Sequence, residues 1–251
     1  MIDLDGYRVL VTGGGRGIGA ACCRLFAEVG AAVCVHYRNR EGAAGSVLES
    51  LRTSANQPHF KVAADLSEPP GADAVFDVIG RTWGRLDCLV NNAGIWIRNP
   101  LTELDPQLLN ETWALNAKAV FLCSAAAIPF LEQSVDGSIV NIGSTAGQRG
   151  EAMYSPYAAS KGALIAATKS WSSELAPRIR VNCVAPGWVD TELSAEAFAE
   201  GGREAIEETI PLGRVASPVD IAGPVVFLAS QLARHVTGEV LNVNGGSVLA
   251  G

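Results

Sequence analysis

The stretch Thr12-Gly13-Gly14-Gly15-Arg16-Gly17-Ile18-Gly19 decides the fold of this chain. It follows the short apolar run Arg8-Val9-Leu10-Val11 and leads into a segment of helical period from Ala20 to about Val29. A strand, a glycine loop and a helix in this order let backbone N–H groups and a helix N-terminus hold a pyrophosphate. Glycines allow the tight turn and keep side chains away from the phosphates. A glycine-rich connection without a ligand is the alternative, but the context predicts dinucleotide binding.

The end of the next predicted strand, Ala32–Tyr37, indicates which dinucleotide binds. An Asp or Glu there would hold a ribose 2′-hydroxyl, whereas basic residues accommodate a 2′-phosphate. The chain instead places Tyr37, Arg38 and Arg40 at this position, with Arg16 in the glycine loop. A phosphate carries a charge of about −1.5 to −2 and needs such cations. The sequence therefore favours NADP(H), with NAD as the weaker candidate; a solvated turn is the alternative for Arg38 and Arg40.

The remaining chain alternates strands with helices, which predicts an α/β fold around a parallel sheet. Further strands are expected at Phe60–Ala64, Leu86–Val90, Ser138–Ile142, Arg180–Val184 and Glu239–Val243. Pro69-Pro70-Gly71 is interpreted as a loop. Residues from about 190 to 213 are polar and weakly patterned, and we expect a mobile helical lid over the site. No repeat or linker interrupts the sequence, so residues 1–251 are predicted to form one domain.

Several polar residues follow or interrupt these elements in places where a ligand could lie. Asp65 closes one strand and could accept from an adenine amine, or merely turn the chain. Asn91-Asn92-Ala93-Gly94 follows another strand and suits close approach of a flat ligand. Ser144 follows a strand at the sheet edge where open α/β sheets bind ligands. Asn116 lies inside a long predicted helix opened by Asp105-Pro106, although Asn disfavours helix interiors.

The segment Ser155-Pro156-Tyr157-Ala158-Ala159-Ser160-Lys161 predicts acid–base chemistry. Ser followed by Pro is typical of a capped helix start, and Tyr157 and Lys161 then share one face. A neighbouring ammonium favours the ionised form of a phenol, whose pKa is otherwise about 10. We therefore expect a lowered pKa for Tyr157 and a role in proton transfer. An exposed Tyr beside a solvated Lys is the alternative.

Composition and charge exclude several classes of protein. The 19 basic and 26 acidic residues give a net charge of −7, which argues against nucleic acid or an anionic membrane as a partner. No apolar run is long enough to span a bilayer, and the acidic N-terminus is unlike a signal peptide. The six cysteines form no CxxC pair and are expected to be reduced core residues of a cytoplasmic protein. The three histidines have no metal-site spacing, so no metal is predicted.

Taken together, these motifs resemble the short-chain dehydrogenase/reductase family over essentially the whole chain. The matching residues are the glycine stretch, Asn91–Gly94, Asn116, Ser144, Tyr157 with Lys161, and Pro186-Gly187 with Thr191. Ser144 precedes Tyr157 by 13 residues, the usual family spacing. The resemblance implies a doubly wound Rossmann fold, with a seven-stranded parallel sheet covered by helices on both faces. It also implies a homotetramer or homodimer.

The resemblance further implies roles for individual residues. Tyr157 would be the acid or base at the substrate oxygen, and Lys161 would lower its pKa and hold the nicotinamide ribose. Ser144 would hydrogen-bond the same oxygen, and Asn116 would anchor a water leading to Lys161. The positions that would contact the cofactor are Gly13, Arg16, Gly17, Ile18, Gly19, Tyr37, Arg38, Asp65, Leu66, Asn92, Ala93, Gly94, Tyr157, Lys161, Pro186, Gly187, Val189 and Thr191.

The substrate is predicted to be a small-molecule ketone or secondary alcohol. Reduction of 3-oxoacyl groups on acyl carrier protein is the alternative, but Leu131–Asp136 has no cation and Glu174 stands where such reductases typically have Arg. A net charge of −7 would also repel an acidic carrier. An apolar or ring-shaped substrate would contact Ser144, Trp96, Gln148, Tyr154 and Trp188, with Arg149 and Met153 nearby. Ordinary packing could equally explain these side chains, and the chain could instead be a non-catalytic nucleotide sensor or a purely structural subunit.

Overall fold

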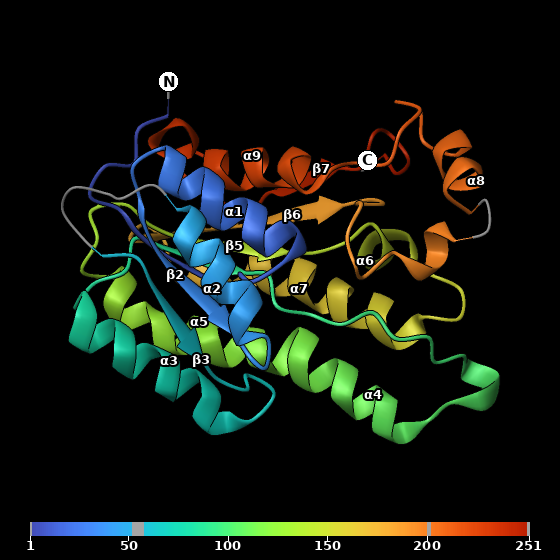
Figure 1. The fold of residues 1–251 in the computed structure, drawn as a ribbon, viewed down its shortest axis with the longest axis horizontal. Coiled ribbons are helices and arrows are strands. Elements are labelled where there is room, and N and C mark those ends of the chain that lie inside the picture. The colour runs from blue at the N-terminus through green and yellow to red at the C-terminus, as the bar shows by residue number, and fades with distance from the viewer. Residues whose placement is uncertain (1, 52–57, 200–201, 250–251) are drawn as a thin grey trace.

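Seven parallel strands form one sheet in the order β3-β2-β1-β4-β5-β6-β7 in a computed structural model that describes residues 2–51, 58–199 and 202–249 (Figure 1). The order reverses between β1 and β4, and in such sheets ligands bind at the carboxyl ends beside this reversal. The strands are β1 Arg8–Val11, β2 Ala32–Tyr37, β3 Phe60–Ala63, β4 Cys88–Asn91, β5 Gly137–Ile142, β6 Ile179–Pro186 and β7 Val240–Val243.

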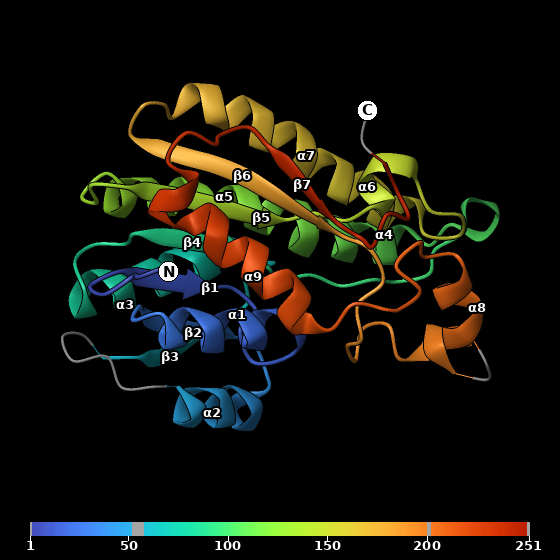
Figure 2. The same cartoon turned by 90° about the horizontal axis from the view of Figure 1, so that it is seen from above.

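Helices cover both faces of the sheet, which confirms the predicted doubly wound α/β fold (Figure 2). One face packs on α1 (Gly17–Glu28), α2 (Glu41–Ser50) and α9 (Pro218–Ala229). The other packs on α3 (Pro69–Thr82) and α5 (Ala119–Leu131), with α7 (Ser155–Glu174) alongside. Short elements complete the described chain: η1 Leu101–Glu103, α4 Pro106–Trp113, η2 Ala114–Lys118, α6 Ala146–Arg149, η3 Glu196–Phe198, α8 Gly202–Glu208 and η4 Gln231–Ala233.

Two helix starts differ from the sequence-based predictions. Pro69-Pro70-Gly71 does not form a loop but the first turn of α3, where proline is tolerated because its missing N–H would have no helical partner. Gly71 lets this turn pack on the Asp65 carbonyl, against which a Cβ would clash. The α7 helix starts at Ser155, but its N-cap is Tyr154 and no side chain caps it, so Ser155 lacks the predicted capping role.

The elements α4, η2 and α5 follow one another without a break and form one helical segment of 26 residues, Pro106–Leu131, with the π-turn η2 in its middle. The Asp105 side chain caps it by accepting from the Gln107 N–H at 2.7 Å, as the sequence predicted. By length and composition this helix could cross a membrane, but its inner side packs against α3 and α7 as a core helix does. The π-turn rotates Asn116 into the interior, and such turns occur frequently at functional sites.

The six cysteines (Cys22, Cys23, Cys34, Cys88, Cys123 and Cys183) are all buried and none forms a disulfide, as predicted. Burial raises the pKa of each of these thiols, which keeps them protonated and unreactive. Among the described residues, no group of three or more His, Cys, Asp or Glu side chains could hold a metal ion.

Gly19→Ala is expected to reduce the free energy of unfolding by about 1–3 kcal/mol, because the new Cβ would overlap the Gly13 carbonyl oxygen and the Asn92 amide. Gly45→Ala in the interior of α2 is the matched control: its Cβ would meet only Lys61 Nζ at 3.7 Å. The control should gain about 0.5–1 kcal/mol. Urea unfolding measures both; equal effects would contradict the predicted close packing of the glycine loop.

Candidate active site

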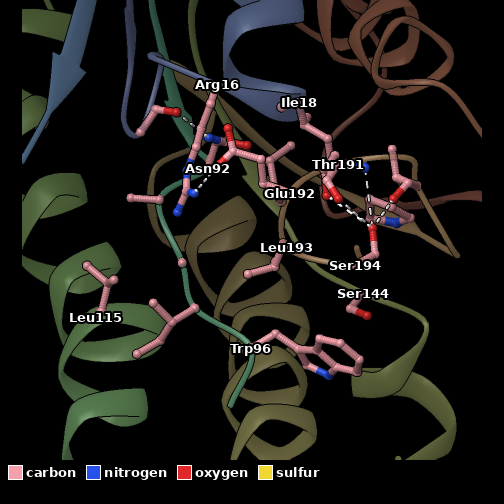
Figure 3. A pocket seen from close by; sticks show the side chains of 18 of the residues that line it. Arg16, Ile18, Asn92, Trp96, Leu115, Ser144, Thr191, Glu192, Leu193 and Ser194 are labelled. Carbon is pink, nitrogen blue, oxygen red and sulfur yellow. Dashed lines mark hydrogen bonds and ion pairs between the residues drawn. The ribbon is translucent and has the colours of Figure 1, made fainter. Parts of the chain in front are cut away.

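A cleft of about 470 Å³ opens at the carboxyl ends of the central strands. Its walls come from the glycine loop after β1, the ends of β2 and β4, the Ser144 loop, α7, and the segment after β6. Figure 3 shows Arg16, Ile18 and Asn92 at one end of this cleft and Trp96 and Ser144 at the other. The doubly wound sheet thus gathers into one cavity residues that lie far apart in the sequence.

The glycine loop has the backbone needed to hold an anion. Gly13 and Gly17 have φ angles of 64° and 51°, a left-handed conformation that side-chain-bearing residues rarely adopt. Helix α1 starts at Gly17, and no side chain caps its first turn, so this helix end is available to a phosphate. The Asn92 amide donates to the carbonyl oxygens of Thr12 and Gly13 at 2.8 and 3.2 Å, and so fixes the loop against the end of β4.

His36, for which the sequence indicated no role, braces the same loop. Its Nδ1 accepts from the Gly13 N–H at 3.1 Å, and its Nε2 lies 3.1 Å from the Ala64 carbonyl oxygen. Burial lowers the pKa of His36 to about 4, so the ring is neutral near pH 7 and Nε2–H donates to Ala64. The position of His36 near the end of a buried strand could have indicated a role at the cleft, but its hydrogen-bond partners could not be predicted from the sequence.

Arginine side chains gather at the β2 end of the cleft, each with an acidic partner. Arg38 lies 3.6 Å from Asp65, which also accepts hydrogen bonds from the Ser67 N–H and hydroxyl. Asp65 therefore stabilises a turn, one of its two predicted roles, and its contact with an adenine amine stays a prediction. Arg16 and Arg40 each contact Glu192 at 2.7 Å. Glu192 belongs to the segment predicted to cover the site and lines the cleft, but its contacts with the two arginines were not predicted.

Ser144, Tyr157 and Lys161 converge on the cleft from β5 and α7. The Ser144 side chain lies close enough to the phenol of Tyr157 to act on its pKa, and Lys161 Nζ lies 5.9 Å from the centre of the phenol ring. Lys161 Nζ also donates to the Ile142 carbonyl oxygen at 2.8 Å. The spacing of four residues along a helix therefore places the phenol and the ammonium together as predicted.

Burial acts on this pair against the predicted pKa shift. It raises the pKa of Tyr157 to about 12, although the nearby Ser144 side chain opposes the change. Burial likewise lowers the pKa of Lys161 to about 8. The expected lowering of the Tyr157 pKa by Lys161 is absent from the protein alone, because the loss of hydration disfavours both charged forms.

Asn116 lies behind these residues rather than in the wall of the cleft. Its side-chain amide accepts from the Ile95 N–H and donates to the Ile95 carbonyl oxygen, both at 2.8 Å. It also donates to the Ser160 hydroxyl at 3.3 Å. A Cβ on Gly94 would lie 3.2 Å from the Asn116 oxygen and 3.6 Å from Lys161 Nζ, so only glycine gives these groups full room.

Aromatic rings surround the Ser144 end of the cleft. Trp96 stacks on Tyr154, with ring centres 4.3 Å apart and planes within 10°, and meets Trp188 edge-on at 5.8 Å. Phe198 of the predicted lid lies 5.9 Å from Trp188. Glu151 also lies beside this wall, and burial raises its pKa, although the nearby Trp96 side chain opposes the change. The arrangement can accept a flat apolar group beside a polar edge.

Most of the predicted site residues line the cleft, and five do not. Tyr154 supports Trp96 from outside, and Gln148 donates to the Asn242 side chain at 2.7 Å instead of facing the cavity. Gly19 acts through close packing, while Asp65 and Asn116 have the roles described above. Met153, named as a neighbour of the pocket, is exposed and lies outside it. Unpredicted residues that contribute to the cleft wall include Ile95, Leu115 and Glu151, whereas Glu192 and Leu193 belong to the predicted lid segment.

A doubly wound sheet with a glycine loop at its switch point and a Ser–Tyr–Lys cluster in the same cleft defines a dinucleotide-dependent oxidoreductase. A family model described as Enoyl-(Acyl carrier protein) reductase matches residues 13–247. The chain belongs to the short-chain dehydrogenase/reductase family, and it is an NAD(P)-dependent enzyme acting on CH–OH and C=O groups.

Several known proteins resemble the chain over nearly their full length. The 3-oxoacyl-[acyl-carrier-protein] reductase FabG of Thermotoga maritima is 37% identical over 250 residues, covering 98% of this chain and 99% of that protein. The 3beta-hydroxysteroid dehydrogenase 1 of Eggerthella lenta is 37% identical, covering 98% and 95%. The structure of the angucycline C-6 ketoreductase LanV with bound NADP superposes with a TM-score of 0.91 at 35% identity, covering 99% and 98%.

Lys161→Met is expected to raise the free energy of unfolding by about 1–3 kcal/mol at pH 7, the relief of a buried charge less the loss of the bond to Ile142. The pKa of Lys161 falls from 10.5 to about 8 on folding. Between these values only the unfolded chain keeps the proton, so the wild type gains stability with rising pH and the advantage of the variant shrinks.

Urea unfolding of both proteins at pH 7 and at about pH 9.5 measures this difference. A variant that is less stable than the wild type at pH 7, or a difference that does not change with pH, would contradict the buried-ammonium interpretation.

Proposed function

We propose that this enzyme transfers hydride between NADP(H) and a small-molecule ketone or secondary alcohol, with Tyr157 as the general acid or base. The observation that carries the proposal is the placement of Lys161 beside Tyr157, with Ser144 close to the phenol, in the wall of a cleft that also contains the glycine loop and the uncapped start of α1. Asn116, Ser144, Tyr157 and Lys161 are the proposed catalytic set.

The chemistry follows from the environment of these side chains. Tyr157 donates its proton to the carbonyl oxygen during reduction, and Ser144 donates a hydrogen bond to that oxygen as negative charge develops. A phenol with its pKa raised to about 12 is protonated near neutral pH. The proton donor that reduction needs is therefore present, whereas the phenolate base that oxidation needs is scarce. Lys161, whose pKa is lowered to about 8, can hold or release a proton near neutral pH, and so it can reprotonate Tyr157 after the phenol has donated its proton. NADP(H), when bound, supplies or accepts the hydride.

The arginines at the β2 end support NADP(H) over NAD. Arg16, Arg38 and Arg40 surround the position where a ribose 2′-phosphate would lie, and no acid occupies the end of β2. A similar enzyme, LanV, binds NADP. The left-handed glycines and the uncapped start of α1 fit a pyrophosphate, so the residues present suit the whole nucleotide.

The aromatic end of the cleft supports a flat, ring-shaped ketone as substrate. Trp96 and Trp188 offer stacking surface beside Ser144 and Tyr157. The names of two similar proteins refer to a steroid and to an angucycline. Reduction of 3-oxoacyl groups on acyl carrier protein is the second candidate, favoured by the similarity to FabG. The exposed acids Glu132 and Glu174 near the ends of α5 and α7 disfavour an acidic carrier.

Further properties complete the proposal. We infer a single cytoplasmic domain that assembles as a homotetramer or homodimer, with exposed apolar side chains such as Phe121 on α5 available for contacts. Residues 190–213 would act as a mobile lid; η3 and α8 supply the predicted helical character, and residues 200 and 201 lie outside the described chain. A non-catalytic nucleotide sensor would need no Ser–Tyr–Lys cluster.

Tyr157→Phe is expected to reduce kcat for ketone reduction about 10²–10⁴-fold, because it removes the proton donor while keeping the ring. The Kd for NADPH should stay within about threefold of the wild type, since the hydroxyl does not hold the nucleotide phosphates. Stopped-flow turnover and nicotinamide fluorescence measure the two quantities. Retained turnover would refute Tyr157 as the acid, and absence of turnover in the wild type with every ketone would favour the sensor.

Replacement of Trp96 tests the substrate class. The wild type should prefer 2-tetralone to its saturated analogue 2-decalone, and Trp96→Ala should lower kcat/KM for 2-tetralone about three- to tenfold by removing the stacking surface. Trp113→Ala on the surface of α4, outside the cleft, is the control. Equal activity on the two ketones, unchanged by Trp96→Ala, would contradict an aromatic substrate and favour acyl chains.

A further inference from the structure

Glu192 occupies the centre of the arginine cluster at the nucleotide end of the cleft. A single carboxylate oxygen, Oε2, accepts from Arg16 Nη1 and from Arg40 Nη1, each at 2.7 Å. These two cations come from the glycine loop and from the start of α2, whereas Glu192 comes from the segment after β6. Figure 3 shows the side chains of Glu192 and Arg16 meeting across the cleft. The hydrogen bond from Arg16 and the charge of Arg40 lower the pKa of Glu192, so it stays ionised.

The backbone around Glu192 is held in a defined turn. The Ser194 hydroxyl donates to the Val189 carbonyl oxygen and accepts from the Thr191 N–H at 3.3 Å. Thr191 packs against the glycine loop, because a Cβ built on Gly17 would lie 3.3 Å from Thr191 Cγ2. The main chain therefore presents Glu192 toward Arg16 and Arg40.

This placement alters the charge available to a cofactor. Of the three arginines near the proposed 2′-phosphate position, Arg38 already faces Asp65, and the other two share Glu192. A 2′-phosphate carrying nearly two negative charges would have to displace the carboxylate or lie beside it. A nucleotide that ends in a ribose 2′-hydroxyl brings no such charge and leaves the Glu192 contacts undisturbed.

We propose that Glu192 is a specificity-determining residue, which competes with the 2′-phosphate of NADP(H) for Arg16 and Arg40 and thereby narrows the preference over NAD(H). The inference rests on the proposed nucleotide site, but not on the chemistry at Tyr157. Under this proposal, the choice between NADP(H) and NAD(H) depends on an acid in the segment after β6 as well as on the residues at the end of β2.

The same turn connects the cofactor end of the cleft to the lid. Asp190, two residues before Glu192, pairs with Arg203 of α8 at 2.8 Å, and Arg203 lies over the Phe198 ring at 5.4 Å. Displacement of Glu192 by a 2′-phosphate would therefore act on the segment that holds Phe198 beside Trp188. The turn that contains Asp190 and Glu192 therefore connects the nucleotide end of the cleft to the aromatic wall.

An ordinary surface ion pair is the competing interpretation. Glu192, Arg16 and Arg40 keep 58%, 45% and 61% of their side-chain surfaces exposed, and such pairs contribute little to stability. That interpretation predicts equal effects of Glu192 on all adenine nucleotides. Competition predicts an effect confined to nucleotides that carry the 2′-phosphate.

Isothermal titration with 2′,5′-ADP and with 5′-AMP separates the two, because these probes differ only in the 2′-phosphate. Glu192→Gln should tighten binding of 2′,5′-ADP about three- to tenfold and change binding of 5′-AMP less than about twofold. Glu204→Gln removes an equal charge from the exposed face of α8, outside the cleft, and should change neither. In an Arg16→Ala, Arg40→Ala background, the effect of Glu192→Gln should disappear.

The outcomes distinguish the two levels of the proposal. Equal tightening for both probes, or an effect of Glu204→Gln as large as that of Glu192→Gln, would overturn the competition and leave only a general charge effect. Weaker binding of 2′,5′-ADP by Glu192→Gln would also overturn it. If neither 2′,5′-ADP nor NADPH binds the wild type, the proposed nucleotide site itself is wrong.

Discussion

The structure depends on one electrostatic constraint: an ammonium is buried one helical turn from a half-buried phenol. Lys161 is 5% exposed, and its direct protein partner is the Ile142 carbonyl oxygen at the end of β5. Burial pushes the pKa of Lys161 down to about 8 and that of Tyr157 up to about 12, so near pH 7 the phenol is neutral while the ammonium keeps its charge but lies close to losing it. In the proposed function this pair transfers a proton, and a positive nicotinamide or a developing alkoxide nearby would change the pKa values of both groups.

The fold provides this environment by bringing separate elements against α7. The end of β5 supplies the carbonyl partner, and the π-turn η2 rotates Asn116 inward to fix the Ile95 backbone. Gly94 leaves room between Asn116 and Lys161, since a Cβ would crowd both. At the other end of the cleft, His36 and Asn92 hold the glycine loop in its left-handed conformation. Chemistry and nucleotide binding are thus supported by separate networks on one rigid sheet.

Local patterns were sufficient to predict the strands, the sheet class and most of the cleft wall, because periodicity, glycine spacing and helical offsets determine them. The predicted lowering of the Tyr157 pKa was wrong, since the loss of hydration depends on which elements cover the residue and not on its neighbours in sequence. The contacts of His36 and Glu192 were not predicted for the same reason: their partners lie 23 to 176 residues away. The prediction of a loop at Pro69-Pro70-Gly71 was wrong because proline is common both in loops and in the first turn of a helix.

Direct titration of Lys161 tests the central constraint most closely. The chain has four lysines, so ¹³Cε-labelled lysine gives few NMR signals, and the signal missing from Lys161→Met identifies Lys161. The account predicts a midpoint near 8 in the protein without nucleotide, from the lowered pKa of the buried ammonium. A midpoint at the ordinary value of 10.5 would show a hydrated lysine and contradict the account.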